Sequence, residues 1–126
     1  MDFVNLSQKM NEAGKENRRM TQLFGTEQFS SWMLHLEPGE GTDMHYHLSP
    51  ETFLVLEGTA SVKGIKGGER IIEKNDVVFF GAKGYYQITS VGPGPLILFG
   101  NRSEGFGGPH VAARKEKSES LDLSKK

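Results

Sequence analysis

The sequence predicts a single all-β domain, and three features of the chain support this fold class. Short apolar runs alternate with Gly, Pro, Asn and Asp at close intervals, which is typical of strands joined by turns. No long segment between these runs carries a helical period. At 126 residues, the chain has the length of one domain with its own core. These features together favour a sandwich or a barrel.

The predicted elements divide the chain into an arm, a barrel and a tail. Residues 7–20 are polar without a strand pattern, and they predict either a short helix or an irregular arm. Turns are expected at Gly58-Thr59 and Asn75-Asp76. Strands are expected at residues 21–24, 29–36, 43–47, 52–57, 59–63, 69–73, 77–80, 85–90 and 95–100. The predicted organisation is an N-terminal arm (1–20), a β-barrel (21–111) and a charged, flexible C-terminal tail (112–126).

The composition restricts the possible partners of the chain. Fifteen Lys and Arg residues are balanced by 16 Asp and Glu residues, so there is no general electrostatic case for binding nucleic acid or an anionic membrane. No apolar run approaches the length of a membrane span, and the N-terminus lacks the pattern of a signal peptide. We therefore expect a cytoplasmic protein. Cysteine is absent, so any metal must be bound by nitrogen and oxygen ligands.

One stretch of the sequence predicts a metal site. His45 and His47 are two residues apart, so on a strand both imidazoles point to the same face, with Cα atoms roughly 6.6 Å apart. Pro50 marks a turn after them, and Glu51 then begins a new apolar run that can face the histidines. Two imidazoles and one carboxylate form the facial triad of non-haem iron(II) oxygenases, which leaves positions open for substrate or oxygen.

The run that begins at Glu51 is apolar on both faces. Phe53 and Val55 share the face of Glu51, while Leu54 and Leu56 lie on the opposite face. A strand that is apolar on both sides is covered on both sides. If one face lines the barrel interior, the other meets another sheet or another subunit. This pattern supports a homodimer.

The spacing Gly39-x5-His45-x-His47-x3-Glu51-x6-Gly58 resembles the first motif of the cupin superfamily at all five fixed positions. The resemblance covers roughly residues 29–100. It implies a cupin-type jelly-roll β-barrel with one metal site inside, and it adds support for a homodimer.

Cupins usually supply a fourth ligand, a histidine, from a second motif, and this sequence departs from that pattern. Without gaps, Tyr86 takes the place of the histidine; with a one-residue insertion, Gln87 does. Three alternatives follow. Tyr86 coordinates the metal or acts beside it as a catalytic acid or base. Gln87 is a weak neutral ligand through its amide oxygen. Otherwise the site is a triad completed by water, and Tyr86 fills the barrel.

Two further residues have alternative interpretations. His110 follows a glycine-rich stretch, which predicts either an ordinary exit loop or a lid. Asp43 is two residues before His45, so on a strand it lies on the same face as His45 and His47. It either orients an imidazole or caps the turn at Gly41-Thr42.

The expected function is that of a small metal-dependent enzyme that acts on a small oxygen-containing molecule. One divalent transition metal is expected, with Fe2+ as the first guess and Mn2+, Ni2+ or Zn2+ as alternatives. Dioxygenase-like chemistry comes first, because the site has open positions, and isomerase or lyase chemistry with Tyr86 as acid or base comes next. The competing hypothesis is a metal-assisted binding or sensor module without turnover.

Overall fold

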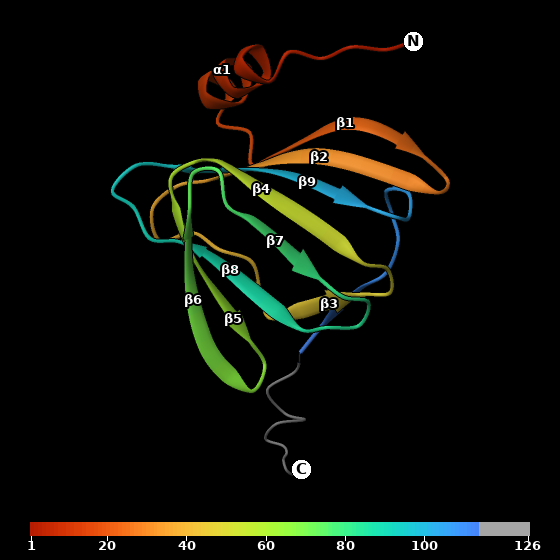
Figure 1. The fold of residues 1–126 in the computed structure, drawn as a ribbon. Helices are drawn as coiled ribbons and strands as arrows, with labels where there is room; N and C mark the ends of the chain where they lie inside the picture. The colour runs from red at the N-terminus through yellow and green to blue at the C-terminus, as the bar shows by residue number, and fades with distance from the viewer. Residues whose placement is uncertain (114–126) are drawn as a thin grey trace.

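Ten strands follow a single helix in the computed structural model, which describes residues 1–113. Figure 1 shows their arrangement. The elements are α1 (Leu6–Glu16), β1 (Met20–Thr26), β2 (Phe29–Leu36), β3 (His45–His47), β4 (Glu51–Glu57), β5 (Thr59–Gly64), β6 (Gly67–Glu73), β7 (Val77–Phe80), β8 (Tyr86–Ser90), β9 (Leu96–Arg102) and β10 (His110–Ala112). Among these residues, no helix is long and apolar enough to cross a membrane.

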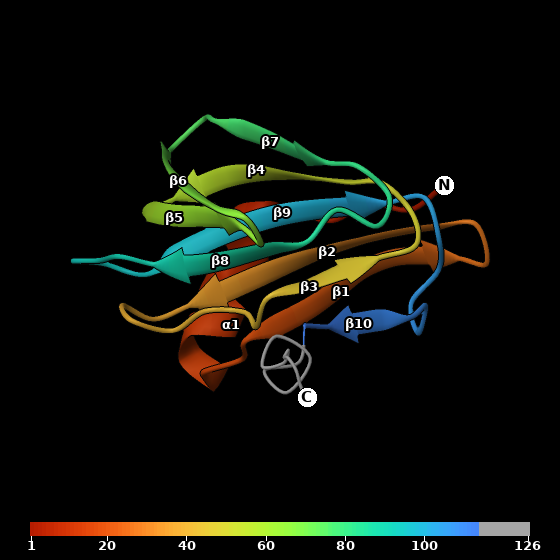
Figure 2. The same cartoon turned by 90° about the horizontal axis from the view of Figure 1, so that it is seen from below.

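The strands form two five-stranded sheets in which every pairing is antiparallel. The first sheet has the order β1-β2-β9-β4-β7 and the second has the order β10-β3-β8-β5-β6. Strands that are distant in the sequence are neighbours in both sheets, as a jelly roll requires. Figure 2 shows the two layers from below, with β3 and β10 side by side. The predicted all-β jelly-roll barrel is therefore confirmed.

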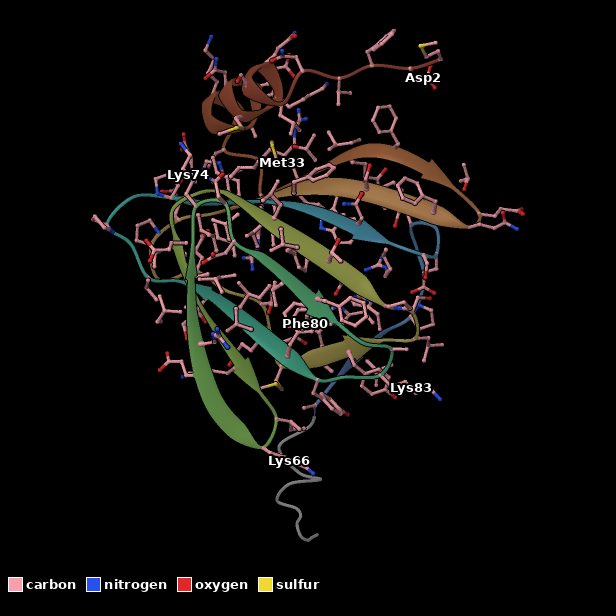
Figure 3. The ribbon with its side chains drawn as sticks, viewed as in Figure 1. Asp2, Met33, Lys66, Lys74, Phe80 and Lys83 are labelled. Carbon is pink, nitrogen blue, oxygen red and sulfur yellow. The ribbon has the colours of Figure 1, made fainter. Side chains whose placement is uncertain are left out.

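Alternation along each strand places the core between the sheets. In β8, Tyr86 and Ile88 are buried inside, while Gln87 and Thr89 are only half-buried. Phe80 of β7 also points between the sheets (Figure 3). The buried residues of this core are Trp32, Leu36, Phe53, Val55, Ala60, Ile72, Tyr86, Ile88, Leu96 and Leu98.

The helix covers part of the outer face of the first sheet. Asn5 caps its first turn by accepting a hydrogen bond from the backbone N–H of Gln8 at 2.9 Å, and Asn17 ends it in the left-handed conformation. Ala13 is completely buried against Met33 and Ile97, and Leu56 packs beside them. Figure 3 shows Met33 on the helix side of the sheet. The outward apolar face of β4 was expected to meet another sheet or another subunit. At Leu56 this face is instead covered by the helix of the same chain.

The predicted strands agree with the structure except at the C-terminal end. The nine expected strands are present with small shifts in their bounds, and residues 7–20 contain the helix rather than an irregular arm. The expectation of an exit loop or lid at His110 is wrong, because this residue begins β10, which pairs with β3. The predicted flexible tail falls almost entirely on residues 114–126, which lie outside the described residues.

Candidate metal centre

Strands β3 and β10 bring three histidines together. In their antiparallel register His110 lies opposite His47, and Ala112 lies opposite His45. One ring nitrogen from each of His45, His47 and His110 lies within 4.8 Å of the others. Two nitrogens bound to the same transition metal are separated by at most about 4.2 Å, twice a bond length of ~2.1 Å. The observed spacing exceeds this limit, and the rings of His45 and His110 are parallel, so the side chains would have to turn toward an ion to bind it together.

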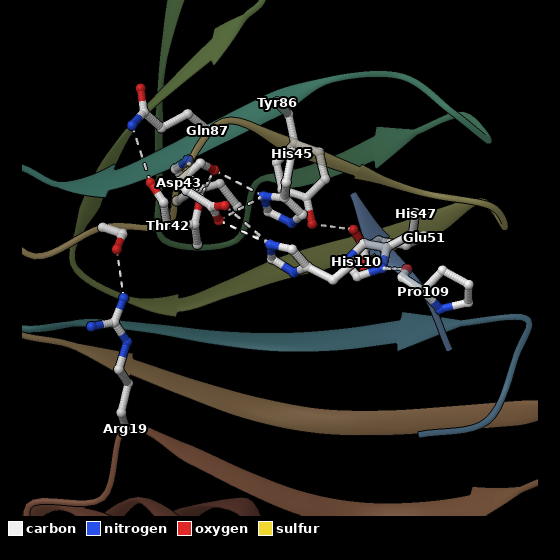
Figure 4. Close-up of polar contacts among 12 residues, drawn as sticks. Arg19, Thr42, Asp43, His45, His47, Glu51, Tyr86, Gln87, Pro109 and His110 are labelled. Carbon is white, nitrogen blue, oxygen red and sulfur yellow. Dashed lines mark hydrogen bonds and ion pairs between the residues drawn. The ribbon is translucent and has the colours of Figure 1, made fainter. Parts of the chain in front are cut away.

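Hydrogen bonds to the chain orient all three rings (Figure 4). His45 donates from Nδ1 to the backbone carbonyl of Asp43 at 2.8 Å, and His47 donates from Nδ1 to that of Pro109 at 2.9 Å. His110 donates from Nε2 to the carboxylate of Asp43 at 3.0 Å. In each imidazole, one nitrogen is thus hydrogen-bonded to the protein and the other can bind a metal. Metal-bound histidines usually have this arrangement.

Burial keeps the β3 histidines neutral. Desolvation lowers the pKa of His45, and nearby histidines add to this effect. Desolvation also lowers the pKa of His47, and the positive charge of Arg102 contributes. Neutral imidazoles expose the lone pair that a metal needs. Burial alone would raise the pKa of Asp43, but its interactions with His110 and His45 lower it overall, which favours the carboxylate form that accepts from His110.

The structure holds Glu51 in a different set of interactions. Its side chain is buried, Tyr86 donates its hydroxyl hydrogen to one carboxylate oxygen, and Arg102 donates to the other at 3.0 Å. The cluster of three ring nitrogens does not include this carboxylate. Burial raises the pKa of Glu51 even though both partners favour its charged form. Glu51 therefore lies next to the histidine cluster with both oxygens already engaged.

Tyr86 lies between the histidines and this buried pair. Its ring centroid is 4.4 Å from that of His45, and on its other side it stacks on Phe80 at 3.8 Å. Burial raises its pKa, and the charge of Glu51 raises it further, so the phenol keeps its proton at neutral pH. The single hydroxyl hydrogen of Tyr86 is donated to Glu51, so these two groups can exchange a proton next to the histidine cluster.

The structure does not bring Gln87 to the histidines. Its side-chain amide donates to the backbone carbonyl of Thr42 at 3.1 Å, as Figure 4 shows. It follows Tyr86 in β8 and therefore faces the opposite side of that strand. The geometry gives no support to Gln87 as a ligand.

The site thus contains a histidine that sequence reasoning did not place there. His45 and His47 come together as their spacing predicts, but the third ring belongs to His110. Two observations in the sequence pointed to it only weakly: the second motif lacks its histidine, and His110 begins a short run, His-Val-Ala-Ala. The pairing of β10 with β3 joins segments about 60 residues apart, and no local pattern reveals such a contact.

A jelly-roll barrel with a histidine cluster on its second sheet is the architecture of a small cupin. The family model described as Cupin domain matches residues 32–99, more than half of the chain, and the chain belongs to this family. No curated protein matches the sequence.

Solved structures share this fold at low sequence identity. A protein from Bacillus halodurans is 14% identical with a TM-score of 0.73, over 88% of each chain. A double-stranded β-helix protein from Klebsiella pneumoniae is 20% identical with a TM-score of 0.68, over 75% of this chain and 82% of the other. The DMSP lyase DddQ from Ruegeria pomeroyi is 15% identical with a TM-score of 0.66, over 75% of this chain and 50% of the other. At these identities the likeness establishes the fold alone.

Proposed function

We propose that the protein is a small metal-dependent cupin enzyme that performs acid/base chemistry, of the lyase or isomerase type, on a small oxygen-containing molecule. The observation that carries this proposal is the placement of Tyr86 between the three-histidine cluster and the Glu51–Arg102 pair. Two of the similar solved structures are DMSP lyases, which adds support from the fold.

In this proposal His45, His47 and His110 hold the metal. When bound, a divalent metal supplies Lewis acidity to an oxygen atom of the substrate. The ligand set is neutral and nitrogen-based, which suits Fe2+, Mn2+, Ni2+ and Zn2+ alike, so the donors do not select among them.

The remaining residues prepare a proton donor. Burial keeps the Tyr86 phenol protonated, and its hydrogen bond to Glu51 holds its direction. Arg102 balances the charge of Glu51, and its guanidinium lies 4.8 Å from the centroid of the Trp32 ring, which fixes it from the other side. When Tyr86 takes a proton from a substrate, Glu51 can accept the hydroxyl proton that Tyr86 already carries, and Glu51 can return this proton when Tyr86 later gives one to the product.

The test is product formation by the metal-loaded protein. We would incubate it with DMSP and with a panel of small hydroxy acids, keto acids and sugars, follow products by NMR, and record oxygen uptake. Product without oxygen uptake is the expected result. Substrate-dependent oxygen uptake would support the second candidate, a dioxygenase, which the positions left open around three ligands would permit. Saturable binding without chemical change under any of the four metals would favour a binding or sensor module.

Tyr86→Phe is expected to separate catalysis from metal binding. Loss of the hydroxyl group removes the proton donor, so kcat should fall roughly 10²- to 10⁴-fold, while the metal content stays at its normal value. Steady-state kinetics and elemental analysis measure the two quantities. Tyr85→Phe is the matched control, because it deletes a hydroxyl one residue away, and it should leave kcat unchanged. Full activity of Tyr86→Phe would rule out the proposed role.

We also propose a homodimer, formed through the part of the outer face that α1 leaves uncovered. Phe79 and Val77 of β7 are each 65% exposed there, and Phe29 of β2 is also exposed. Such an apolar surface on a small soluble domain is typical of an interface. Light scattering coupled to gel filtration should give twice the chain mass of 14.0 kDa. Phe79→Ser should shift the mass toward the monomer, while Ile65→Ser, which changes an exposed apolar residue at the turn between β5 and β6, should not. A monomeric wild-type protein would contradict the proposal.

A further inference from the structure

The contacts between β3 and β10 are reciprocal. His47 precedes the turn into β4, and its Nδ1 hydrogen is accepted by Pro109, the residue before β10. His110 begins β10, and its Nε2 hydrogen is accepted by Asp43, which lies just before β3. Each segment thus supplies a histidine to the cluster and also holds the far nitrogen of the other segment's histidine. The metal centre and the docking of the C-terminal strand therefore share the same contacts.

Asp43 contacts two of the three histidines, and its Oδ1 lies 3.5 Å from His45 Nδ1 as well as 3.0 Å from His110 Nε2. Its backbone carbonyl accepts from His45 Nδ1 at 2.8 Å, and its carboxylate oxygens lie 3.0 and 3.2 Å from His110 Nε2. These contacts place the rings of His45 and His110 parallel, with centroids 4.1 Å apart and an interplanar angle of 2° (Figure 4). One residue therefore sets the orientation of both rings.

The hydrogen bonds also determine which nitrogens remain for a metal. His45 and His47 use Nδ1 for the protein, so each keeps the lone pair on Nε2. His110 uses Nε2 for Asp43, so it keeps the lone pair on Nδ1. The predicted ligand set is mixed, with two Nε2 atoms and one Nδ1 atom.

We propose that Asp43 is a positioning residue of the metal centre, whose carboxylate selects Nδ1 of His110 as the ligand atom. The inference rests on the metal site of the proposed function but not on the reaction. A carboxylate that accepts from the far nitrogen of a metal-bound histidine fixes the tautomer and raises the basicity of the ligand. It also places negative charge beside three neutral ligands, which favours a divalent cation.

The test combines zinc affinity with NMR of the ring nitrogens. Asp43→Ala should bind zinc roughly 10- to 100-fold more weakly than the wild type in competition with a chelator. Asp43→Asn keeps a neutral acceptor and should lose less. Glu40→Gln is the control, since it removes a nearby exposed carboxylate that has no hydrogen bond to the three clustered histidines, and the zinc affinity of this variant should equal that of the wild type. In the ¹⁵N spectrum of the zinc-loaded wild type, ligation should occur through Nδ1 of His110 and Nε2 of the other two.

Each possible outcome has a distinct meaning. Unchanged affinity in Asp43→Ala, or ligation of His110 through Nε2 in the wild type, would overturn the role of Asp43 and leave the proposed function intact. Normal zinc binding with the predicted ligand atoms but without turnover would contradict the proposed enzymatic function and leave this inference intact. A wild-type protein that binds no zinc would overturn the metal site on which both depend.

Discussion

Alanine at position 47 is expected to abolish metal binding. The wild type should carry about one divalent metal ion per chain, and His47→Ala should carry less than about a tenth of this after desalting. The physical reason is that His47 supplies one of the three ring nitrogens of the proposed site within residues 1–113, and two imidazoles alone hold a metal weakly. His110→Ala should have the same effect, because its ring belongs to the same cluster. Elemental analysis of protein purified without added metal or chelator provides the measurement.

Two further variants make this experiment decisive about the ligand set. His35→Ala is the control for loss of a buried histidine, since His35 lies outside the cluster and contacts Glu37. Its metal content should be normal. Glu51→Gln distinguishes the observed cluster from the triad that the spacing predicts. Normal metal in Glu51→Gln supports three histidines, whereas loss of metal in this variant together with normal metal in His110→Ala would support His45, His47 and Glu51.

Replacement of Arg102 with methionine is expected to cause a large loss of stability. Arg102 and Glu51 are both buried and form an ion pair at 3.0 Å, so removal of the guanidinium leaves a buried carboxylate without a counter-charge. Breaking such a pair from one side costs about 3–5 kcal/mol. Trp32, the single tryptophan of the chain, lies against Arg102, and its fluorescence can follow unfolding in urea.

The double variant Glu51→Gln/Arg102→Met provides the control. With the Glu51 carboxylate also removed, the unpaired charge at that buried position is gone, and the amide can still accept from Tyr86. Glu104, which lies 3.4 Å from Arg102 and is partly exposed, loses its pair in both variants. The double variant should therefore be more stable than Arg102→Met alone. Equal loss in the single and double variants would show that Arg102 acts through packing on Trp32 rather than through its charge.

The fold could be predicted largely from local patterns. The strands that begin at Glu51 and Tyr86 alternate between buried and half-buried residues, and the turns at Gly58 and Asn75 both adopt positive φ, at 89° and 77°. The polar pattern of residues 7–20 does not distinguish a helix from an irregular arm, because much of the stability of α1 comes from Ala13 packing on the sheet. Strand β10 has no recognisable pattern in the sequence, since three residues after a glycine-rich loop carry too little periodicity to identify a strand.

The sequence by itself determined that His45 and His47 act as a pair, because a two-residue spacing on a strand places both rings on one face regardless of the rest of the fold. Only the tertiary structure decided what accompanies them. Glu51 has the expected position in the motif, yet its carboxylate is engaged by Tyr86 and Arg102, which are 35 and 51 residues away. His110 reaches the cluster through strand pairing with β3. Contacts between distant segments depend on the packing of the whole barrel, so they cannot be predicted from short stretches of the sequence.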